Sequence, residues 1–543
     1  MDKVSLLWPD HRAGYSRRVF DLGDTAMADL RVNELVAGAR VDAAREILAV
    51  LKSMPVDEET VRYRQEIFND FAHSPALADG FRAMMPTFSY LDTLLREKPE
   101  EELTLWRVLN RMRELDGYMQ AVRSLHRLLT ETGAASEGLR ALRDMVGRIA
   151  EDEMFRALAE DLPARMPELN EIRSVTLGLN VNEWLEPSEV TLLSVNRTSF
   201  TSTPLLQKAL DLLRTRQADG LDLSELSHGL SRVHQISFQS ANPMFRFSRD
   251  IDVMLKAVLR DMIGLLRRHA RVSTKFLLDL QPEISFSLAG LNLFRPLVAR
   301  GFRFCVPAVS AGEKRCASLE GLFSASLALR MAGSDRDAAA MVLNDLRFDE
   351  RARIYVLTGP NRGGKTTLTQ AIGQAQVLFQ AGLPVPAREA TLSPVDGVFT
   401  HFPTAESGVL DQGRLGEEAA RLREILLAAT PRSLVLLNES ISSTSYTEAL
   451  YISRDVLKAL RYLGCRGIFN THAHDLAGFA AEVNEGVTGT SVVESLVAGM
   501  KDGERSYEVR VGPPLGSSYA HEIAVRNGLS FEQIVEARGG PSG

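Results

Sequence analysis

The chain has 543 residues, enough for about three or four domains. Hydrophobic residues make up 45% and charged residues 24%, and the net charge of −7 excludes a uniformly basic nucleic-acid coat, so any DNA contact needs a local patch. We find no long apolar run and expect neither a signal peptide nor a membrane span. Cys305, Cys316 and Cys465 are too few for a disulfide framework. We therefore expect a reducing, cytoplasmic location.

The first half of the chain is predicted to be mainly helical. Residues 1–40 are expected to form an irregular arm, and residues 41–310 a helical core and lever. Helices are predicted over 42–51, after Asp57 as an N-cap, and over 103–115 and 138–149. Charged residues of these helices, such as Arg111, Arg113 and Glu114, are expected to face solvent. Alternating residues around a turn near 186–187 predict a hairpin over 173–196, so a small β insert is expected inside the helical region.

A helix predicted over 247–270 carries a basic stripe. At about 100° per residue, four side chains fall within roughly 60° of one another; they are Lys256, Arg260, Arg267 and Arg271. Such a stripe would meet the phosphates of double-stranded DNA. A solvated helix face is the commoner situation and stays open as the alternative. A further helix or helix pair over 277–300 and a strand over 302–309 lead into the second half of the chain.

A phosphate-binding loop is predicted between a buried strand over 354–357 and a helix over 368–379. The sequence GPNRGGKT fits the pattern of Gly, four residues and Gly-Lys-Thr. Its backbone N–H groups and the helix N-terminus would hold the phosphates of ATP, and the predicted binding residues are Gly359, Pro360, Asn361, Arg362, Gly363, Gly364, Lys365, Thr366 and Thr367. Lys365 is expected to reach the β- and γ-phosphates, and Thr366 to bind Mg²⁺. The alternative, a structural glycine turn, is disfavoured because strand, loop and helix agree.

Three more strands, over 395–402, 433–437 and 466–471, alternate with helices and predict a parallel sheet. In a phosphate-loop ATPase, an acid at the end of one such strand holds the metal, and a following Glu orients the attacking water. Asn438 occupies the first position, where its neutral oxygen would hold Mg²⁺ less tightly, and Glu439 the second. His472, after the third strand, is predicted to contact the γ-phosphate. A hairpin is predicted from strands over 491–497 and 507–511.

The loop sequence TGPNRGGKTTLTQAIGQA resembles the ATPase domain of the MutS family of DNA mismatch-repair proteins. Other family landmarks follow in order: DGVFT at 396–400, LVLLNESISSTS at 434–445, Thr471-His472 and GSSYAHEIAVRNGL at 516–529. VRYRQEIF at 61–68 resembles the start of the family's helical core. The resemblance spans most of residues 55–540. It implies an α/β ABC-type ATPase over 311–543, preceded by the helical core and lever.

Three departures from the family pattern shape what we expect. Little more than 50 residues precede the helical core, so we expect a short member without the mismatch-recognition domain. The Ser-Thr of the dimer-facing signature loop is missing from 411–418, although Gly413-Arg414 remains. Asn438 stands where the family has its metal-binding Asp. No nuclease-like tail follows residue 543, so we also expect no Smr domain.

The resemblance implies an ATPase that dimerises through its ATPase domains, with ATP and Mg²⁺ between the subunits. Lys365, Glu439 and His472 would be the catalytic residues of a slow reaction. The levers would form an ATP-gated clamp on double-stranded or branched DNA, in repair or recombination and without mismatch reading. A DNA scaffold that binds nucleotide with little or no hydrolysis is the alternative. A phosphate-loop kinase is disfavoured by the long helical region. No membrane partner is expected, and the sequence does not specify other repair proteins.

Overall fold

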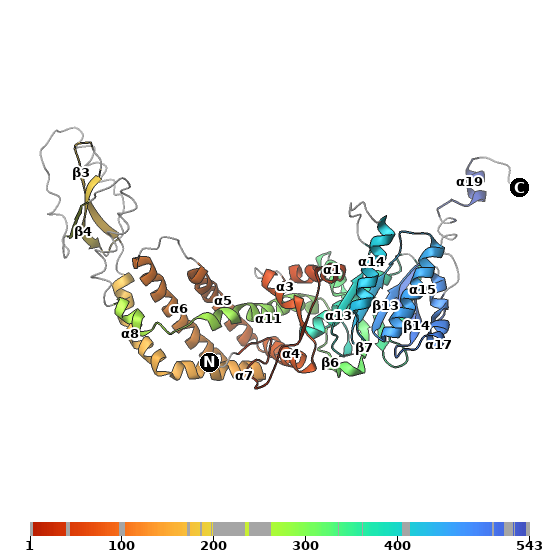
Figure 1. The fold of residues 1–543 in the computed structure, drawn as a ribbon, viewed down its shortest axis with the longest axis horizontal. Helices are drawn as coiled ribbons and strands as arrows, with labels where there is room; N and C mark the ends of the chain where they lie inside the picture. Colours follow the sequence, from red (N-terminus) through yellow and green to blue (C-terminus); the bar gives the residue numbers. More distant parts are fainter. Residues whose placement is uncertain are drawn as a thin grey trace. The chain divides into compact units, whose positions relative to one another are not determined.

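The computed structural model describes residues 4–39, 44–96, 104–170, 174–184, 187–196, 198, 234–237, 262–334, 336–360, 362–403, 413–501, 504–514, 525 and 527–538 (Figure 1). The chain divides into two compact units. One comprises Met1–Asp79, Ala134–Ala141 and Pro282–Gly543, and the other comprises Gly80–Gly133 and Leu142–Gln281. The boundaries predicted at residues 40 and 310 do not coincide with the limits of these units, because the arm and the first core helix lie in the same unit as residues 282–543.

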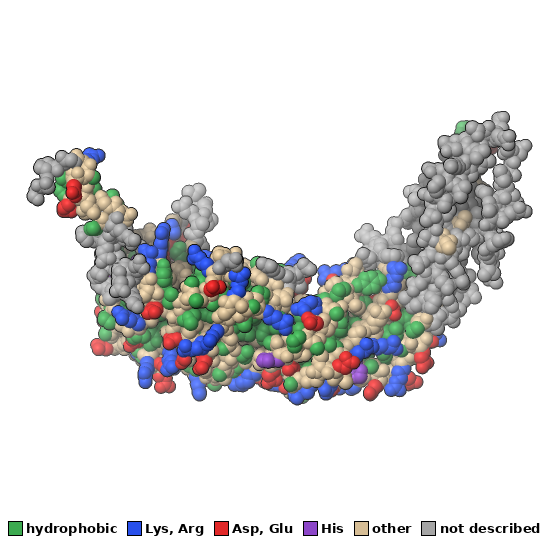
Figure 2. Space-filling view, turned by 180° about the vertical axis from the view of Figure 1, so that it is seen from behind, with side chains coloured by type: hydrophobic (Ala, Val, Ile, Leu, Met, Phe, Trp, Pro, Cys, Tyr) green, Lys and Arg blue, Asp and Glu red, His purple; other side chains and the backbone are tan. Residues whose placement is uncertain are grey.

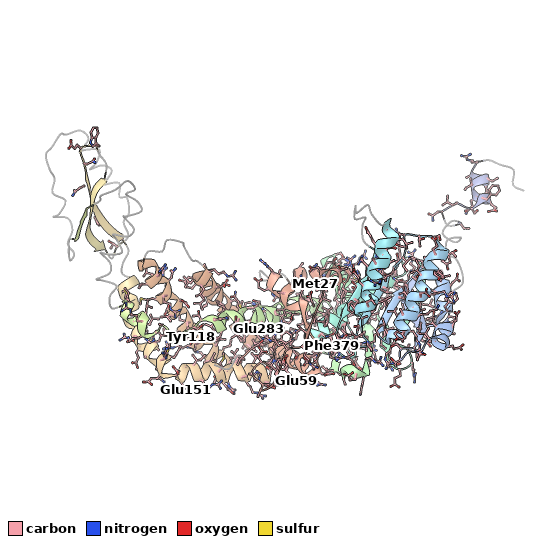
Figure 3. All side chains as sticks on the ribbon, viewed as in Figure 1. Met27, Glu59, Tyr118, Glu151, Glu283 and Phe379 are labelled. Atoms are coloured by element: carbon pink, nitrogen blue, oxygen red, sulfur yellow. The ribbon has the colours of Figure 1, made fainter. Side chains whose placement is uncertain are left out.

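Long amphipathic helices build the second unit. It contains most of α5 (Pro75–Arg96), all of α6 (Thr104–Glu131), most of α7 (Glu137–Glu151), α8 (Glu153–Asn170) and the first residues of α11 (Lys275–Ala299). Tyr118 of α6, labelled in Figure 3, packs edge-on against Phe155 and Phe276, with ring centroids 6.0 and 6.2 Å apart. This contact joins α6, α8 and α11 in one core.

One charged residue of α6, Glu114, was predicted to face solvent but is buried. Glu114 is only 6% exposed. Its carboxylate accepts a hydrogen bond from Thr274 Oγ1 at 2.8 Å and pairs with Arg111 at 2.7 Å. A buried carboxylate persists only with such partners, whereas the neighbouring Arg113 is exposed as expected.

The predicted β insert is confirmed as an antiparallel hairpin. It pairs β3 (Ser174–Val181) with β4 (Pro187–Asn196). A third strand, β5 (His234–Ser237), pairs with β4 and was not predicted. Trp184 lies in the described part of the turn with 80% of its surface exposed.

A six-stranded sheet forms the centre of the first unit. Its order is β11 (Val398–His401), β12 (Leu434–Asn438), β13 (Arg466–Asn470), β9 (Ile354–Thr358), β14 (Val493–Lys501) and β15 (Glu504–Val511). All neighbours pair in parallel except β14 and β15, which form the predicted hairpin. Every residue of β9, β12 and β13 is buried, as expected of parallel strands covered on both faces.

Helices cover both faces of this sheet. The core on one face includes side chains of α14 (Gly413–Ala428), α15 (Tyr446–Leu463), α16 (His474–Gly478) and α17 (Ala480–Gly486). On the other face lies α13 (Lys365–Gln380), where Gly373 meets the side chain of Leu436. Because the strands run in parallel, their carboxyl ends meet at one edge, where the residues after β9, β12 and β13 come together.

A smaller sheet has the order β6 (Ala308–Val309), β10 (Glu389–Leu392), β7 (Ala317–Leu322) and β8 (Asn344–Phe348), and α12 (Ala325–Gly333) follows β7. The strand predicted over 302–309 was too long. Only Ala308 and Val309 form a strand, and Cys305 makes a single bridge to Val385. Pro307, which has no N–H to donate to a ladder, separates the two.

The N-terminal arm was predicted to be irregular, but it forms regular elements that pack against α13. It forms β1 (Val19–Asp21), α1 (Asp24–Asp29) and α2 (Val32–Gly38). The helix predicted over 42–51 is present as α3 (Ala44–Lys52), and β2 (Ser53–Pro55), which follows it, pairs antiparallel with β1. Leu30 is fully buried against Gly373 of α13, where a Cβ would come within 2.3 Å of it. The close approach therefore requires a glycine in α13.

Two further contacts fix the arm. The backbone N–H of Leu6 and the hydroxyl of Ser5 both donate to Glu283 of α11 at 2.6 Å. Burial raises the pKa of Glu283, labelled in Figure 3, to about 7.

Asp57 caps α4 (Glu58–His73) as predicted, because its side chain accepts a hydrogen bond from the N–H of Thr60.

Candidate nucleotide-binding site

The phosphate-binding loop lies between the end of β9 and the start of α13. Gly359 has φ of +138°, and a Cβ there would come within 2.8 Å of the Ala498 side chain. Gly364, the N-cap of α13, has φ of +85°. Both backbone conformations favour glycine. The loop therefore needs its glycines to turn from the strand into the helix, where free N–H groups attract anions.

Lys365 starts α13 and bends back over the loop. Its Nζ donates to the carbonyl oxygens of Gly359 at 3.0 Å and Pro360 at 3.2 Å. The residue is 4% exposed. Burial lowers the pKa of Lys365, and the charge of Glu439 opposes this shift only in part. The ammonium is thus held by neutral oxygens that a phosphate group would outcompete.

Thr366 points to the end of β12. Its Oγ1 donates to Asn438 Oδ1 at 3.0 Å. The same oxygen accepts a hydrogen bond from Nδ2 of Asn470, at the end of β13. Asn438 and Asn470 are opposite each other in the parallel ladder, with 4% and 0% of their surfaces exposed.

Glu439 and His472 form a pair at the same edge. Nε2 of His472 lies 2.8 Å from Oε1 of Glu439. This hydrogen bond lowers the pKa of Glu439, despite partial burial. Glu439 has φ of +50°, a conformation held by its N–H bond to the Asn470 carbonyl at 2.8 Å. Non-glycine residues in this region are typical of functional sites.

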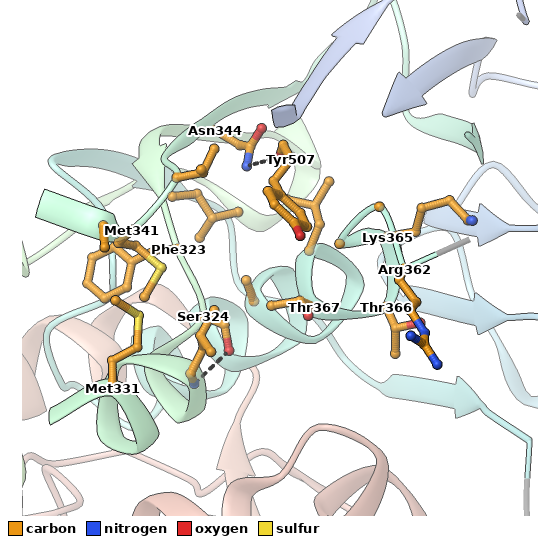
Figure 4. Close-up of a pocket in the computed structure, with 18 of the residues that line it drawn as sticks. Phe323, Ser324, Met331, Met341, Asn344, Arg362, Lys365, Thr366, Thr367 and Tyr507 are labelled. Atoms are coloured by element: carbon orange, nitrogen blue, oxygen red, sulfur yellow. Dashed lines mark hydrogen bonds between the residues drawn. The ribbon is translucent and has the colours of Figure 1, made fainter. Parts of the chain in front are cut away.

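A cavity of about 490 Å³ adjoins the loop. Figure 4 shows Lys365, Thr366 and Arg362 on one side, with Phe323, Met331 and Met341 on the other. Tyr507 lies between them, with Cδ1 3.3 Å from where a Cβ on Gly364 would be, and its carbonyl accepts from Asn344 at 3.3 Å. A polar end beside an apolar end suits a phosphorylated ligand with an aromatic base.

The oxygens around Thr366 fit a magnesium ion. Mg²⁺ prefers oxygen ligands, keeps several waters and is completed by substrate phosphates. The hydroxyl of Thr366 and the ionised carboxylate of Glu439 are of this kind, and Asn470 Oδ1 is a buried oxygen without a hydrogen-bond partner in the described structure. Among the described residues, no group of three or more His, Cys, Asp or Glu could hold a metal by itself. The phosphates would therefore have to supply the remaining ligands.

The structure brings together most of the predicted site. Lys365, Thr366, Glu439 and His472 meet at the carboxyl edge, and Arg362, Gly363, Gly364 and Thr367 line the adjoining cavity. Asn361 lies outside the described residues, as do residues 404–412 of the loop before α14.

The predicted basic stripe is described only in part. Lys256 and Arg260 lie outside the described residues, and Arg267 and Arg271 are exposed. On the face shown in Figure 2, basic and acidic side chains are interspersed among the described residues. Because two of its four residues lie outside the described part of the chain, the basic stripe and its contact with DNA remain a prediction.

Sequence reasoning missed two groups of polar residues. No role was predicted for Asn470. None was predicted for the glutamines of α13 either, yet Gln370, Gln374 and Gln380 donate to carbonyls of Asp29, Leu30 and Pro55. Four glutamines within eleven positions of one apolar helix, Gln370, Gln374, Gln376 and Gln380, were the available signal, because a buried amide needs partners.

The fold and site define a P-loop nucleotide-binding protein, in which a loop between a parallel strand and a helix faces polar groups from two further strand ends. Residues 355–538 match the family model of MutS domain V, and residues 56–300 match that of the MutS2 N-terminal domain. The chain belongs to the MutS family, which confirms the family recognised from its motifs.

Several curated proteins are similar to part of this chain. Endonuclease MutS2 of Thermus thermophilus is 36% identical over 196 residues, which are 36% of this chain and 26% of that protein. Endonuclease MutS2 of Thermomicrobium roseum is 34% identical over 207 residues, 38% of this chain and 25% of that protein. The DNA mismatch repair protein MutS of Chloroflexus aurantiacus is 34% identical over 144 residues, 26% of this chain and 15% of that protein.

The chain thus spans about a quarter or less of the curated relatives it matches. The expected lack of a mismatch-recognition domain and of an Smr domain stays a prediction. None of the helices in the described ranges is both long and apolar enough to cross a membrane.

Proposed function

We propose that the chain is a MutS-like ATPase that couples ATP binding to the opening or closing of a dimeric clamp on DNA. The observation that carries the proposal is the meeting of Lys365, Thr366, Glu439 and His472 at one edge of a parallel sheet, beside a cavity with an apolar end. Family membership supports an ATPase domain over 355–538.

The chain's own residues have distinct tasks in the reaction of ATP and water to ADP and phosphate. The loop N–H groups and Lys365 would bind the phosphates. Bound Mg²⁺ would neutralise charge that develops on the phosphate oxygens. Glu439 would accept a hydrogen bond from the attacking water, because its lowered pKa keeps the carboxylate ionised at neutral pH. His472 would hold that carboxylate in place and approach the γ-phosphate.

A scaffold that binds nucleotide with little hydrolysis is the second candidate. Both lone pairs of Asn438 Oδ1 are already used by Thr366 and Asn470, so the metal position lacks a free carboxylate oxygen. This favours slow turnover, whereas the Glu439–His472 pair favours retained hydrolysis. The two candidates differ in rate and share the same ATP site.

A turnover assay with and without duplex or branched DNA separates the candidates. A DNA-responsive release of phosphate supports the clamp ATPase. Tight ATP binding without phosphate release supports the scaffold, and an absence of ATP binding contradicts both. We also propose a homodimer formed through the ATPase domains, for which light scattering with bound ATP is the test. A monomer across the micromolar range would contradict the shared-site arrangement.

A further inference from the structure

Two asparagines meet below the start of the phosphate-loop helix. β12 and β13 are parallel neighbours, and their last residues, Asn438 and Asn470, are in register. Nδ2 of Asn470 donates to Oδ1 of Asn438. Thr366 Oγ1 donates to the same oxygen at 3.0 Å. The pair thus links two strand ends to the residue that is expected to touch magnesium.

These contacts leave Asn438 without a free acceptor. An amide oxygen has two lone pairs, and both are used here. The other end of the amide is an NH₂ group, which only donates. A carboxylate at this position would keep a second oxygen for a magnesium-bound water. Asn438 can therefore orient Thr366 but has no acceptor left for the metal.

Asn470 offers the acceptor that Asn438 lacks. Its Oδ1 is buried and has no hydrogen-bond partner among the described residues. Folded proteins rarely leave such an atom unpaired unless a water, an ion or a function requires it. β13 lies between β12 and β9 in the sheet, so Asn470 ends the strand between Asn438 and the phosphate loop. The N–H of Glu439 bonds to the Asn470 backbone carbonyl at 2.8 Å, which fixes the strand end.

We propose that Asn470 Oδ1 accepts a hydrogen bond from a water molecule on ATP-bound magnesium, and so takes the place of the carboxylate oxygen that Asn438 lacks. The inference rests on the proposed ATP site. Asn438 is then a positioning residue, whose Oδ1 accepts hydrogen bonds from both the Thr366 hydroxyl and the Asn470 amide. Two neutral amides attract a cation less than one carboxylate does. The site should therefore hold the magnesium of Mg-ATP less tightly than a site with a carboxylate.

The test measures metal dependence and not activity. Binding of a fluorescent ATP analogue to the full chain is titrated with Mg²⁺, and Mn²⁺ retention is followed by electron paramagnetic resonance. Asn470→Ala should raise the Mg²⁺ concentration for half-maximal binding by about 3- to 10-fold, the effect of one hydrogen bond. Analogue binding in EDTA should be unchanged. Asn470→Asp should lower the Mg²⁺ midpoint, because it places a charged oxygen at the same point.

A double-mutant cycle separates metal binding from a merely structural role. Asn438→Asp restores a carboxylate at the metal position and should lower the Mg²⁺ midpoint. In that background Asn470→Ala should have a smaller effect, since the acceptor is now supplied twice. Ser491→Ala is the matched control. It removes a buried hydroxyl that has no hydrogen-bond partner among the described residues and lies just before β14, at the amino ends of the parallel strands, so it should leave the midpoint unchanged.

A folded Asn470→Ala with a wild-type Mg²⁺ midpoint would overturn the proposal, as would equal effects in both backgrounds. If Asn470→Ala does not fold, Asn470→Asp decides, and an unchanged or raised midpoint overturns it. If the wild-type chain binds no analogue with or without Mg²⁺, the proposed ATP site itself fails. Binding in EDTA therefore distinguishes the two failures.

Discussion

Replacing Lys365 by methionine should separate ATP binding from folding. Lys365 is 4% exposed and has two backbone carbonyls as hydrogen-bond partners, and burial lowers its pKa. Lys365→Met removes a desolvated charge together with two hydrogen bonds, two effects that oppose each other. We expect the free energy of unfolding to change by less than about 1 kcal/mol. A phosphate contact from a charged donor contributes about 1.5–3 kcal/mol, so ATP affinity should fall by roughly 10- to 150-fold.

Thermal unfolding with and without Mg-ATP measures both quantities in one experiment. At an ATP concentration of about 100 times the Kd, wild-type protein should gain about 2.7 kcal/mol. A variant with a Kd raised 100-fold should gain only about 0.4 kcal/mol at the same concentration. Lys458→Met, an exposed lysine of α15 paired with Asp455, is the matched control and should behave as wild type. If Lys365→Met keeps the full gain, Lys365 does not contact the phosphates. If it unfolds without ATP, the carbonyl contacts are structural and the reasoning about opposing effects is wrong.

Three further predictions follow from the same structure. Turnover should be below the enzyme median of about 10 per second, and Glu439→Gln should retain ATP while stopping phosphate release; equal release by both proteins would exclude Glu439 from catalysis. DNA binding should be salt-sensitive and indifferent to mismatches, and Arg267→Ala with Arg271→Ala should flatten the log–log salt slope by about 2; a strong preference for mismatched duplex would contradict this. The contribution of Glu283 to the free energy of unfolding should fall by about 3 kcal/mol between pH 4.5 and 7, because the folded state holds a proton on Glu283 that the unfolded state has released; the difference between wild type and Glu283→Gln in a pH series of denaturant titrations should show this fall, and parallel pH profiles of the two proteins would contradict it.

Local pattern was enough to predict the central part of the site. The strand–loop–helix around Gly359 and Lys365 depends on residues close together in the sequence, and the structure has it where predicted. The ends of β12 and β13 were placed to within one residue, because buried parallel strands are short apolar runs with polar residues after them. The cap at Asp57 follows from the same local chemistry.

Contacts between distant segments could not be read from the sequence. The arm was predicted to be irregular, but its short helices form because they pack on α13 through Leu30 and Gln374, a contact that local sequence does not reveal.

The sequence by itself determined, to within one residue, where β9, β12 and β13 end and that a helix follows the phosphate-binding loop, and so which side chains could form a nucleotide site. Only the tertiary structure decided that Asn438 lies against Asn470, and that Thr366 donates to the oxygen they share. The physical reason is that strand order and register set which residues are neighbours across a sheet. Register depends on burial of the whole sheet and not on the few residues at any strand end.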